Sequence, residues 1–180
     1  MLVRLLYLSA LWFAISLLTT LIAGSRLKYS HWALSIFWLA GIMFVGNVIA
    51  LFTFGKFLEI IPFSLLAFLF TCYWIWRLRD WNAPGQVTWS MTVLTTVLFI
   101  IYTFLLTAFT PLNPLSFIFA LIFFFLEAIT LMLALAHMHE SLDVVCRTRW
   151  HRLLTNVEPV AGYEPLVSLQ VPAYNEPIEV

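Results

Sequence analysis

Long runs of hydrophobic residues, separated by short polar segments, occupy most of the first 136 residues of the chain. Each run has 19 to 23 residues, and about 20 residues of α-helix are enough to cross the roughly 30 Å hydrocarbon layer of a bilayer. The pattern therefore predicts five transmembrane helices. They cover Leu5–Ala23, Trp32–Phe54, Phe57–Trp76, Val87–Phe109 and Leu115–Ala136.

The turn between the second and third runs is the least defined of these boundaries. If the third helix begins at Phe57, only Gly55 and Lys56 remain for the turn. In the alternative, the turn takes in residues 53–61 and the helix begins near Pro62. Both interpretations keep five spans.

The composition supports a membrane protein and argues against a soluble or disordered chain. Hydrophobic residues make up 63% of the sequence and charged residues 10%, whereas soluble domains have about 45–50% and about 25%. Disordered chains are poor in hydrophobic residues and rich in charge. Nine basic and nine acidic residues give no net charge, so we expect membrane lipid and no nucleic acid as partners. The composition leaves an oligomer open.

The distribution of basic residues predicts which side of the membrane each loop faces. Seven lie in segments on one side of a five-span protein, namely Arg26, Lys28, Arg77, Arg79, Arg147, Arg149 and Arg152, and two, Arg4 and Lys56, lie on the other. Cytoplasmic loops are enriched in Lys and Arg. We therefore expect an integral, multi-pass protein of the bacterial inner (plasma) membrane, with its N-terminus outside and its C-terminal side cytoplasmic.

Tryptophans support these placements, because they gather near the predicted cytoplasmic ends of the second, third and fourth spans. They are Trp32, Trp74, Trp76, Trp81 and Trp89. Amphipathic indole rings favour the headgroup layer of a membrane. We interpret them as an aromatic belt.

Glu127 is the one charged residue near the middle of a predicted span. An ionised carboxylate there costs about 2.5–3.5 kcal/mol on insertion scales, so we expect the side chain to face the bundle, with Asn47 of the second span as a candidate partner. Two hypotheses stay open: Glu127 faces a polar pathway or helix contact, or it is neutral and makes one interhelical hydrogen bond. Glu59 lies near a membrane boundary and is interpreted as interfacial.

Residues 138–165 join the transmembrane region, residues 1–137, to the end of the chain. Helical spacing of hydrophobic residues, and the i,i+4 pair Asp143 and Arg147, predict a helix at the start of this segment. It is either a helix lying on the membrane surface or an extension of the fifth span. A linker containing Gly162 follows. His137 and His139 are two residues apart, so on a helix they point apart and cannot chelate one metal ion.

Residues 166–180 begin with a short segment, Leu166–Val171, that predicts a β-strand. The polar turn Pro172–Pro177 follows. In doubly wound α/β folds, a strand that ends in such a turn opens a nucleotide site, where an aromatic ring stacks on the base and an acidic side chain accepts hydrogen bonds from a ribose hydroxyl. A strand cannot fold alone, so we expect the rest of its sheet to be missing.

The residues Val167–Pro177, which read VSLQVPAYNEP, resemble the first strand and turn of family 2 glycosyltransferases, inverting hexosyltransferases of GT-A fold. The preceding spans make the chain similar to the processive membrane branch, which includes cellulose, curdlan-type β-1,3-glucan, mannan, chitin and hyaluronan synthases. The resemblance implies that Tyr174 lies against the uracil of a UDP-sugar and that Pro172 and Ala173 line the nucleotide. It also implies that Glu176 lies near the nucleoside. In the alternative, Pro172 and Asn175 only form a turn and Tyr174 only packs.

The motifs that carry the chemistry of this family are absent from the sequence. The family needs an Asp-x-Asp-type site for a divalent metal (Mg²⁺ or Mn²⁺) and a catalytic carboxylate, and its processive members have a Gln-x-x-Arg-Trp motif. We therefore expect no catalytic residue, cofactor site or metal ligand in this chain. The fold class expected is an all-α transmembrane bundle followed by the first strand of a truncated GT-A domain.

Three functions follow from these expectations. The first is the membrane portion of an enzyme that transfers sugar from a UDP-sugar to a polysaccharide acceptor, inactive as this fragment. The second is a glycosyltransferase acting on polyprenyl phosphate. The third is a complete small membrane scaffold or transporter subunit in which the motif is accidental.

Overall fold

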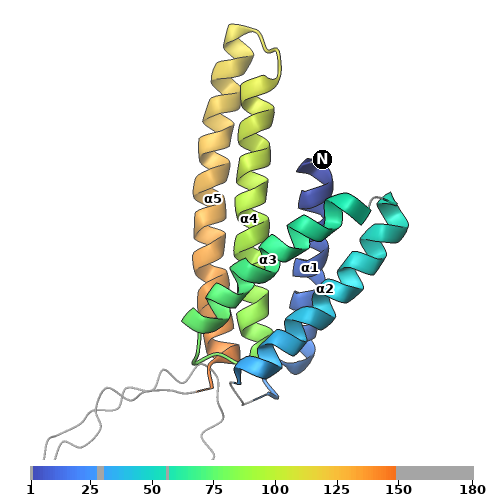
Figure 1. The fold of residues 1–180 in the computed structure, drawn as a ribbon. Coiled ribbons are helices and arrows are strands. Elements are labelled where there is room, and N and C mark those ends of the chain that lie inside the picture. Colours follow the sequence, from blue (N-terminus) through green and yellow to red (C-terminus); the bar gives the residue numbers. More distant parts are fainter. Residues whose placement is uncertain (1, 28–30, 56, 149–180) are drawn as a thin grey trace, which may run out of the picture. The chain divides into compact units, whose positions relative to one another are not determined.

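A computed structural model of the protein describes residues 2–27, 31–55 and 57–148. These residues form five α-helices that are long and apolar enough to cross a membrane. The helices are α1 (Leu2–Ala23), α2 (Trp32–Phe54), α3 (Phe57–Arg77), α4 (Ala83–Phe109) and α5 (Pro114–Cys146). All five belong to one compact unit, Met1–Trp150, and Figure 1 shows their arrangement. The prediction of five long apolar helices is confirmed.

The turn between α2 and α3 takes the shorter of the two predicted forms. Gly55 caps α2 in the left-handed conformation, with φ 64°, and its N–H donates to the carbonyl of Leu51. Glycine adopts this conformation without the steric cost that a Cβ brings. The helix α3 then begins at Phe57, and Pro62 lies inside it. The start near Pro62 was therefore the wrong alternative.

The helix α5 is a single element of 33 residues, about 50 Å long at 1.5 Å per residue. It continues without a break through Ala136, where its hydrophobic run ends. Of the two predicted forms for the segment after residue 137, the structure has the extension of the fifth span. The predicted pair within it is confirmed, because Nη2 of Arg147 lies 2.7 Å from Oδ1 of Asp143.

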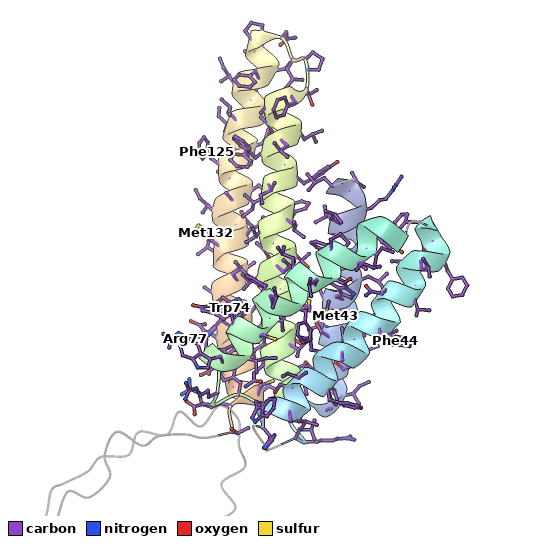
Figure 2. The ribbon with its side chains drawn as sticks, in the orientation of Figure 1. Met43, Phe44, Trp74, Arg77, Phe125 and Met132 are labelled. Atoms are coloured by element: carbon purple, nitrogen blue, oxygen red, sulfur yellow. The ribbon has the colours of Figure 1, made fainter. Side chains whose placement is uncertain are left out.

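The helix α4 packs against each of the other four helices, and α5 packs against α4. Figure 1 shows α4 and α5 side by side, with α3 crossing in front of α4. Most side chains of α5 are exposed because few other elements cover it. Phe125 is 62% exposed and Met132 is 68% exposed, and Figure 2 shows both pointing away from the helices. Large apolar side chains on the outside fit a lipid environment, in which hydrocarbon is the solvent.

Small polar side chains lie where α1 packs against its neighbours. Ser9, Ser16 and Thr20 are buried on one stripe of α1, and the hydroxyls of Thr20 and Thr88 form a 2.7 Å hydrogen bond between α1 and α4. Lipid tails are as apolar as leucine, so helices in a membrane associate through close packing of small residues and interhelical hydrogen bonds. The buried stripe of α1 supplies both.

The hydrophobic core contains a contact among α1, α2 and α3 that requires a glycine. Trp12 of α1 is fully buried and stacks on Phe63 of α3 at 5.4 Å between ring centroids. Gly46 of α2 lies against the indole ring. A Cβ atom at Gly46 would lie 2.7 Å from Nε1 of Trp12 and closer still to Cδ1. The three helices can approach this closely only without a side chain at position 46.

We therefore expect Gly46→Ala to destabilise the bundle by about 1–3 kcal/mol, the usual cost of overpacking a core. Gly41, one and a half turns earlier on α2, is the matched control, because a Cβ there meets nothing within 4 Å. Gly41→Ala should leave stability unchanged or raise it by about 0.5–1 kcal/mol through helix propensity. Unfolding of both variants in detergent measures the difference. Equal effects of the two substitutions would contradict the assigned contact.

Candidate functional site

The described residues carry a polar cluster at the end of the bundle where α4 begins and α5 ends. We call it the junction and define it as residues 24–27, 78–86 and 143–148, together with Ser35. Every residue from 83 to 91 is buried, so the first turns of α4 are enclosed by protein. Buried polar groups without hydrogen bonds are costly. In the junction, side-chain amides and hydroxyls supply many of those hydrogen bonds.

Gln86 connects α4 to two other parts of the junction. Its Nε2 donates to the carbonyl of Leu78 at 2.7 Å and to that of Trp81 at 3.0 Å. Its Oε1 accepts from the hydroxyl of Ser35 on α2. One buried amide therefore fixes the α3–α4 turn and the start of α2 to the first turn of α4.

Asn82 connects α4 to the segment after α1 and to the end of α5. As the N-cap of α4, its Oδ1 accepts from the N–H of Gly85 at 3.1 Å. Its Nδ2 donates to the carbonyls of Gly24 and Leu27, the latter at 2.8 Å. Its backbone N–H donates to the carbonyl of Cys146 at 2.9 Å. This single residue contacts three segments that are far apart in the sequence.

The end of α5 is held by backbone and side-chain bonds to the α3–α4 turn. The N–H and hydroxyl of Thr148 both donate to the carbonyl of Asp80, at 2.7 and 2.8 Å. The indole N–H of Trp81 donates to Oδ1 of Asp143 at 2.8 Å. Cys146 is fully buried, and a Cβ atom at Gly85 would lie 2.8 Å from its sulfur. The last described residues therefore occupy a defined position at this end of the bundle.

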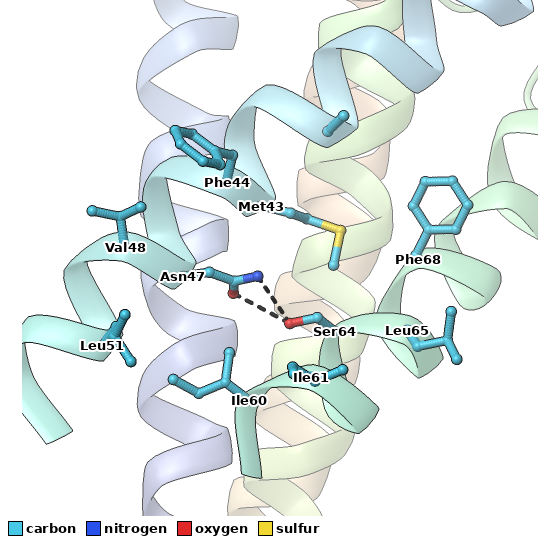
Figure 3. Close-up of a pocket in the computed structure, with 11 residues that line it drawn as sticks. Met43, Phe44, Asn47, Val48, Leu51, Ile60, Ile61, Ser64, Leu65 and Phe68 are labelled. Carbon is cyan, nitrogen blue, oxygen red and sulfur yellow. Dashed lines mark hydrogen bonds between the residues drawn. The ribbon is translucent and has the colours of Figure 1, made fainter. Parts of the chain in front are cut away.

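A groove of about 530 Å³ lies between α2 and α3, away from the junction. Its lining is apolar except for Asn47 and Ser64, which Figure 3 shows facing each other across it. Nδ2 of Asn47 donates to the hydroxyl of Ser64 at 3.0 Å, and that hydroxyl lies 3.2 Å from Oδ1 of Asn47. Because these two groups satisfy each other, the groove presents an apolar surface.

This pairing corrects the expectation that Asn47 would bond to Glu127. Asn47 lies between α2 and α3, whereas α5 packs against α4. Glu127 is half-buried on α5, and no hydrogen bond or ion pair joins it to another described residue. Within the described residues, Glu127 therefore lacks the interhelical hydrogen-bond partner that we expected.

The residues predicted to bind a nucleotide sugar, Pro172, Ala173, Tyr174 and Glu176, lie outside the described residues. So does the predicted strand Leu166–Val171, and the structure does not test either prediction. Of the two histidines considered as metal ligands, His139 packs against Trp81 and Trp89, with ring centroids 5.0 and 4.9 Å apart.

The sequence pattern did not predict the junction, although it contains one capping motif that belongs to it. Asn82 followed by Pro84 is a typical helix start, with an N-cap and then a proline in the first turn. That signal predicts the cap of α4. It does not predict the bonds of Asn82 and Gln86 to other helices, because these depend on how distant segments pack.

This sequence matches no protein-family model, no curated protein and no solved structure.

We expect Asn82→Ala to open the junction. The substitution removes an N-cap, which costs about 1 kcal/mol, and leaves buried carbonyls unpaired at about 1–3 kcal/mol each. Asn113 is the matched control, because it caps α5 through the same bond, at 2.8 Å to Ser116, in an exposed turn. Asn113→Ala should cost only the cap.

Maleimide labelling of Cys146 measures the opening, in a Cys72→Ser background that leaves Cys146 as the chain's single thiol. The buried thiol should react slowly in the parent and in Asn113→Ala, and much faster in Asn82→Ala. If Cys146 stays equally protected in both variants, Asn82 does not hold the junction together.

Proposed function

We propose that this chain is the membrane portion of a family 2 glycosyltransferase that transfers sugar from a nucleotide sugar, a UDP-sugar, to a growing polysaccharide. The observation that carries the proposal is the segment VSLQVPAYNEP, Val167–Pro177, following a bundle of five apolar helices. A strand followed by this turn has the residue types that a nucleotide site needs. The order, helices first and strand second, favours the processive branch over enzymes that act on polyprenyl phosphate.

In this proposal, four residues of the turn have specific roles toward the nucleotide. The ring of Tyr174 stacks on the uracil, and the backbone at Pro172 and Ala173 lies along the nucleoside. Glu176 accepts a hydrogen bond from the nucleoside, as acidic residues do from ribose hydroxyls in α/β nucleotide sites. The divalent metal and the catalytic base come from other parts of the intact enzyme, where the metal neutralises the diphosphate leaving group.

The junction supports the proposal because it fixes the point from which the proposed catalytic segment starts. Thr148 is bonded to Asp80 at the end of the bundle. The 17 residues between Thr148 and Leu166 span at most about 60 Å when fully extended. A catalytic domain that starts with Leu166 would therefore begin within that distance of Thr148.

The proposal includes the orientation of the chain, with the junction in the cytoplasm. Arg26, Arg77, Arg79 and Arg147 belong to segments that meet at the junction, while Arg4 is near the opposite end of α1. An excess of basic residues favours the cytoplasmic side. We therefore place the N-terminus and the α4–α5 turn outside.

The nucleotide assignment predicts that Tyr174→Ala weakens UDP binding by the full-length gene product roughly tenfold, since stacking of a base on an aromatic ring contributes about 1–3 kcal/mol. Tyr174→Phe keeps the ring and should bind UDP nearly as the parent does. Tyr163→Ala, in the segment before the strand, is the control. Titration calorimetry with UDP measures all four proteins. Absence of UDP binding in the parent would refute the function, and equal affinity of the parent and Tyr174→Ala would refute the role of the ring.

The orientation predicts which single cysteines an impermeant maleimide reaches in intact cells. In a cysteine-free background, Asn113→Cys in the exposed α4–α5 turn should be labelled from outside. Ser25→Cys, exposed at the junction end, should be labelled only after the cells are opened. The reverse pattern would place the junction outside and contradict the proposed topology.

A further inference from the structure

A pocket of about 450 Å³ lies at one side of the junction, between the end of α3 and the last turns of α5, and is lined in part by junction residues. Its walls combine aromatic and basic side chains, namely Trp74, Arg77, Arg79, Trp81, His139 and Arg147. Figure 2 shows Trp74 and Arg77 at the end of α3, where this helix crosses in front of α5. The pocket shares no described lining residue with the apolar groove between α2 and α3.

The charges around the pocket favour an anionic ligand. Three guanidinium groups line it against two carboxylates, Asp80 and Asp143. The carboxylate of Asp143 is engaged by Nε of Arg147 at 2.8 Å and by the indole N–H of Trp81 at 2.8 Å. The pair of Asp143 and Arg147 is therefore neutral, which leaves Arg77 and Arg79 against Asp80, and the pocket keeps one net positive charge.

Arg77 is the basic group most available to a ligand. Its side chain is exposed at the last residue of α3, and no hydrogen bond or ion pair joins it to another residue of the described part. Arg79, by contrast, lies over the ring of Trp76 at 5.4 Å and donates to the backbone of that residue. A guanidinium binds phosphate oxygens through two parallel N–H donors. Arg77 is thus the expected phosphate contact.

The position of the pocket along the helices identifies the kind of phosphate. The hydrophobic runs of α3 and α5 end at Trp76 and Ala136, and the pocket lies around and just beyond these residues. Trp74 is a partly exposed residue of its lining, and indole rings favour the headgroup layer. A ligand at this depth has its acyl chains in the hydrocarbon and its headgroup at the pocket. Basic pockets between transmembrane helices bind lipid headgroups in this way.

We propose that this pocket binds the phosphate of an anionic phospholipid, with Arg77 as its main contact. The accessible part of the Trp74 ring packs against the glycerol region of the same lipid. The bound lipid joins the end of α3 to the end of α5. This proposal does not rest on the function of residues 166–180.

The test compares phosphatidylglycerol with phosphatidylcholine, using the parent protein and two variants in mixed micelles. Phosphatidylglycerol should raise the melting temperature of the parent, and phosphatidylcholine should not. Arg77→Gln should weaken the apparent affinity for phosphatidylglycerol roughly tenfold, the effect of losing one charge-assisted contact. The control is Arg26→Gln, which removes an exposed charge at the same end of the bundle but outside the pocket. It should change the affinity by no more than about twofold.

Further measurements separate the proposal from its alternatives. Arg77→Gln should melt like the parent without added lipid and keep Cys146 protected from maleimide, which shows that the fold is intact. Arg77→Lys keeps the positive charge but loses the planar guanidinium with its two parallel donors. Its apparent affinity for phosphatidylglycerol should lie between those of the parent and Arg77→Gln. Equal losses in Arg77→Gln and Arg26→Gln, or no preference for phosphatidylglycerol in the parent, would overturn the proposal. Equal stabilisation by inorganic phosphate would also overturn it, because the ligand would then be a free anion.

Discussion

The start of α4 can be buried only because the polar groups around it bond to one another. The first N–H groups of a helix have no partner inside the helix, and water cannot reach them when residues 83–91 are enclosed. Asn82 caps the helix with its oxygen and uses its nitrogen for the segment after α1. Gln86 closes the α3–α4 turn. The packing of α4 against the other four helices depends on these two amides.

The same constraint explains why small polar side chains are buried in this bundle while many large apolar side chains are exposed. Ser9, Ser16 and Thr88 are buried, while large apolar side chains of α5 are exposed. In lipid, an apolar side chain gains little by moving inside, whereas a hydroxyl gains a hydrogen-bond partner. Helix contacts therefore include small and polar residues beside the hydrophobic core, and many aliphatic and aromatic side chains of α5 face outward.

Hydropathy was enough to predict five spans, because a run of about 20 apolar residues has few alternatives to a membrane helix. It could not settle where α3 begins or whether α5 continues past Ala136, since both depend on local capping and on the packing of α5 against α4. The hydrogen-bond partner of Asn47 could not be predicted either, because the sequence gives no distances between helices. Asn82 carried a recognisable capping signal, but its two bonds to residues 24 and 27 come from tertiary packing. The nucleotide-binding prediction for Tyr174 rests on sequence alone.

The helix α5 is attached firmly at only one of its ends. Near Cys146 it is bonded to Asn82 and Asp80, while toward Pro114 it shares a hairpin with the outer half of α4, whose side chains are largely exposed. A helix of about 50 Å adjusts to bilayers of different thickness mainly by tilting. With one end fixed, we expect the tilt to move the α4–α5 turn and to leave Thr148 almost still. Such a motion would leave the two hydrogen bonds of Thr148 to Asp80 in place.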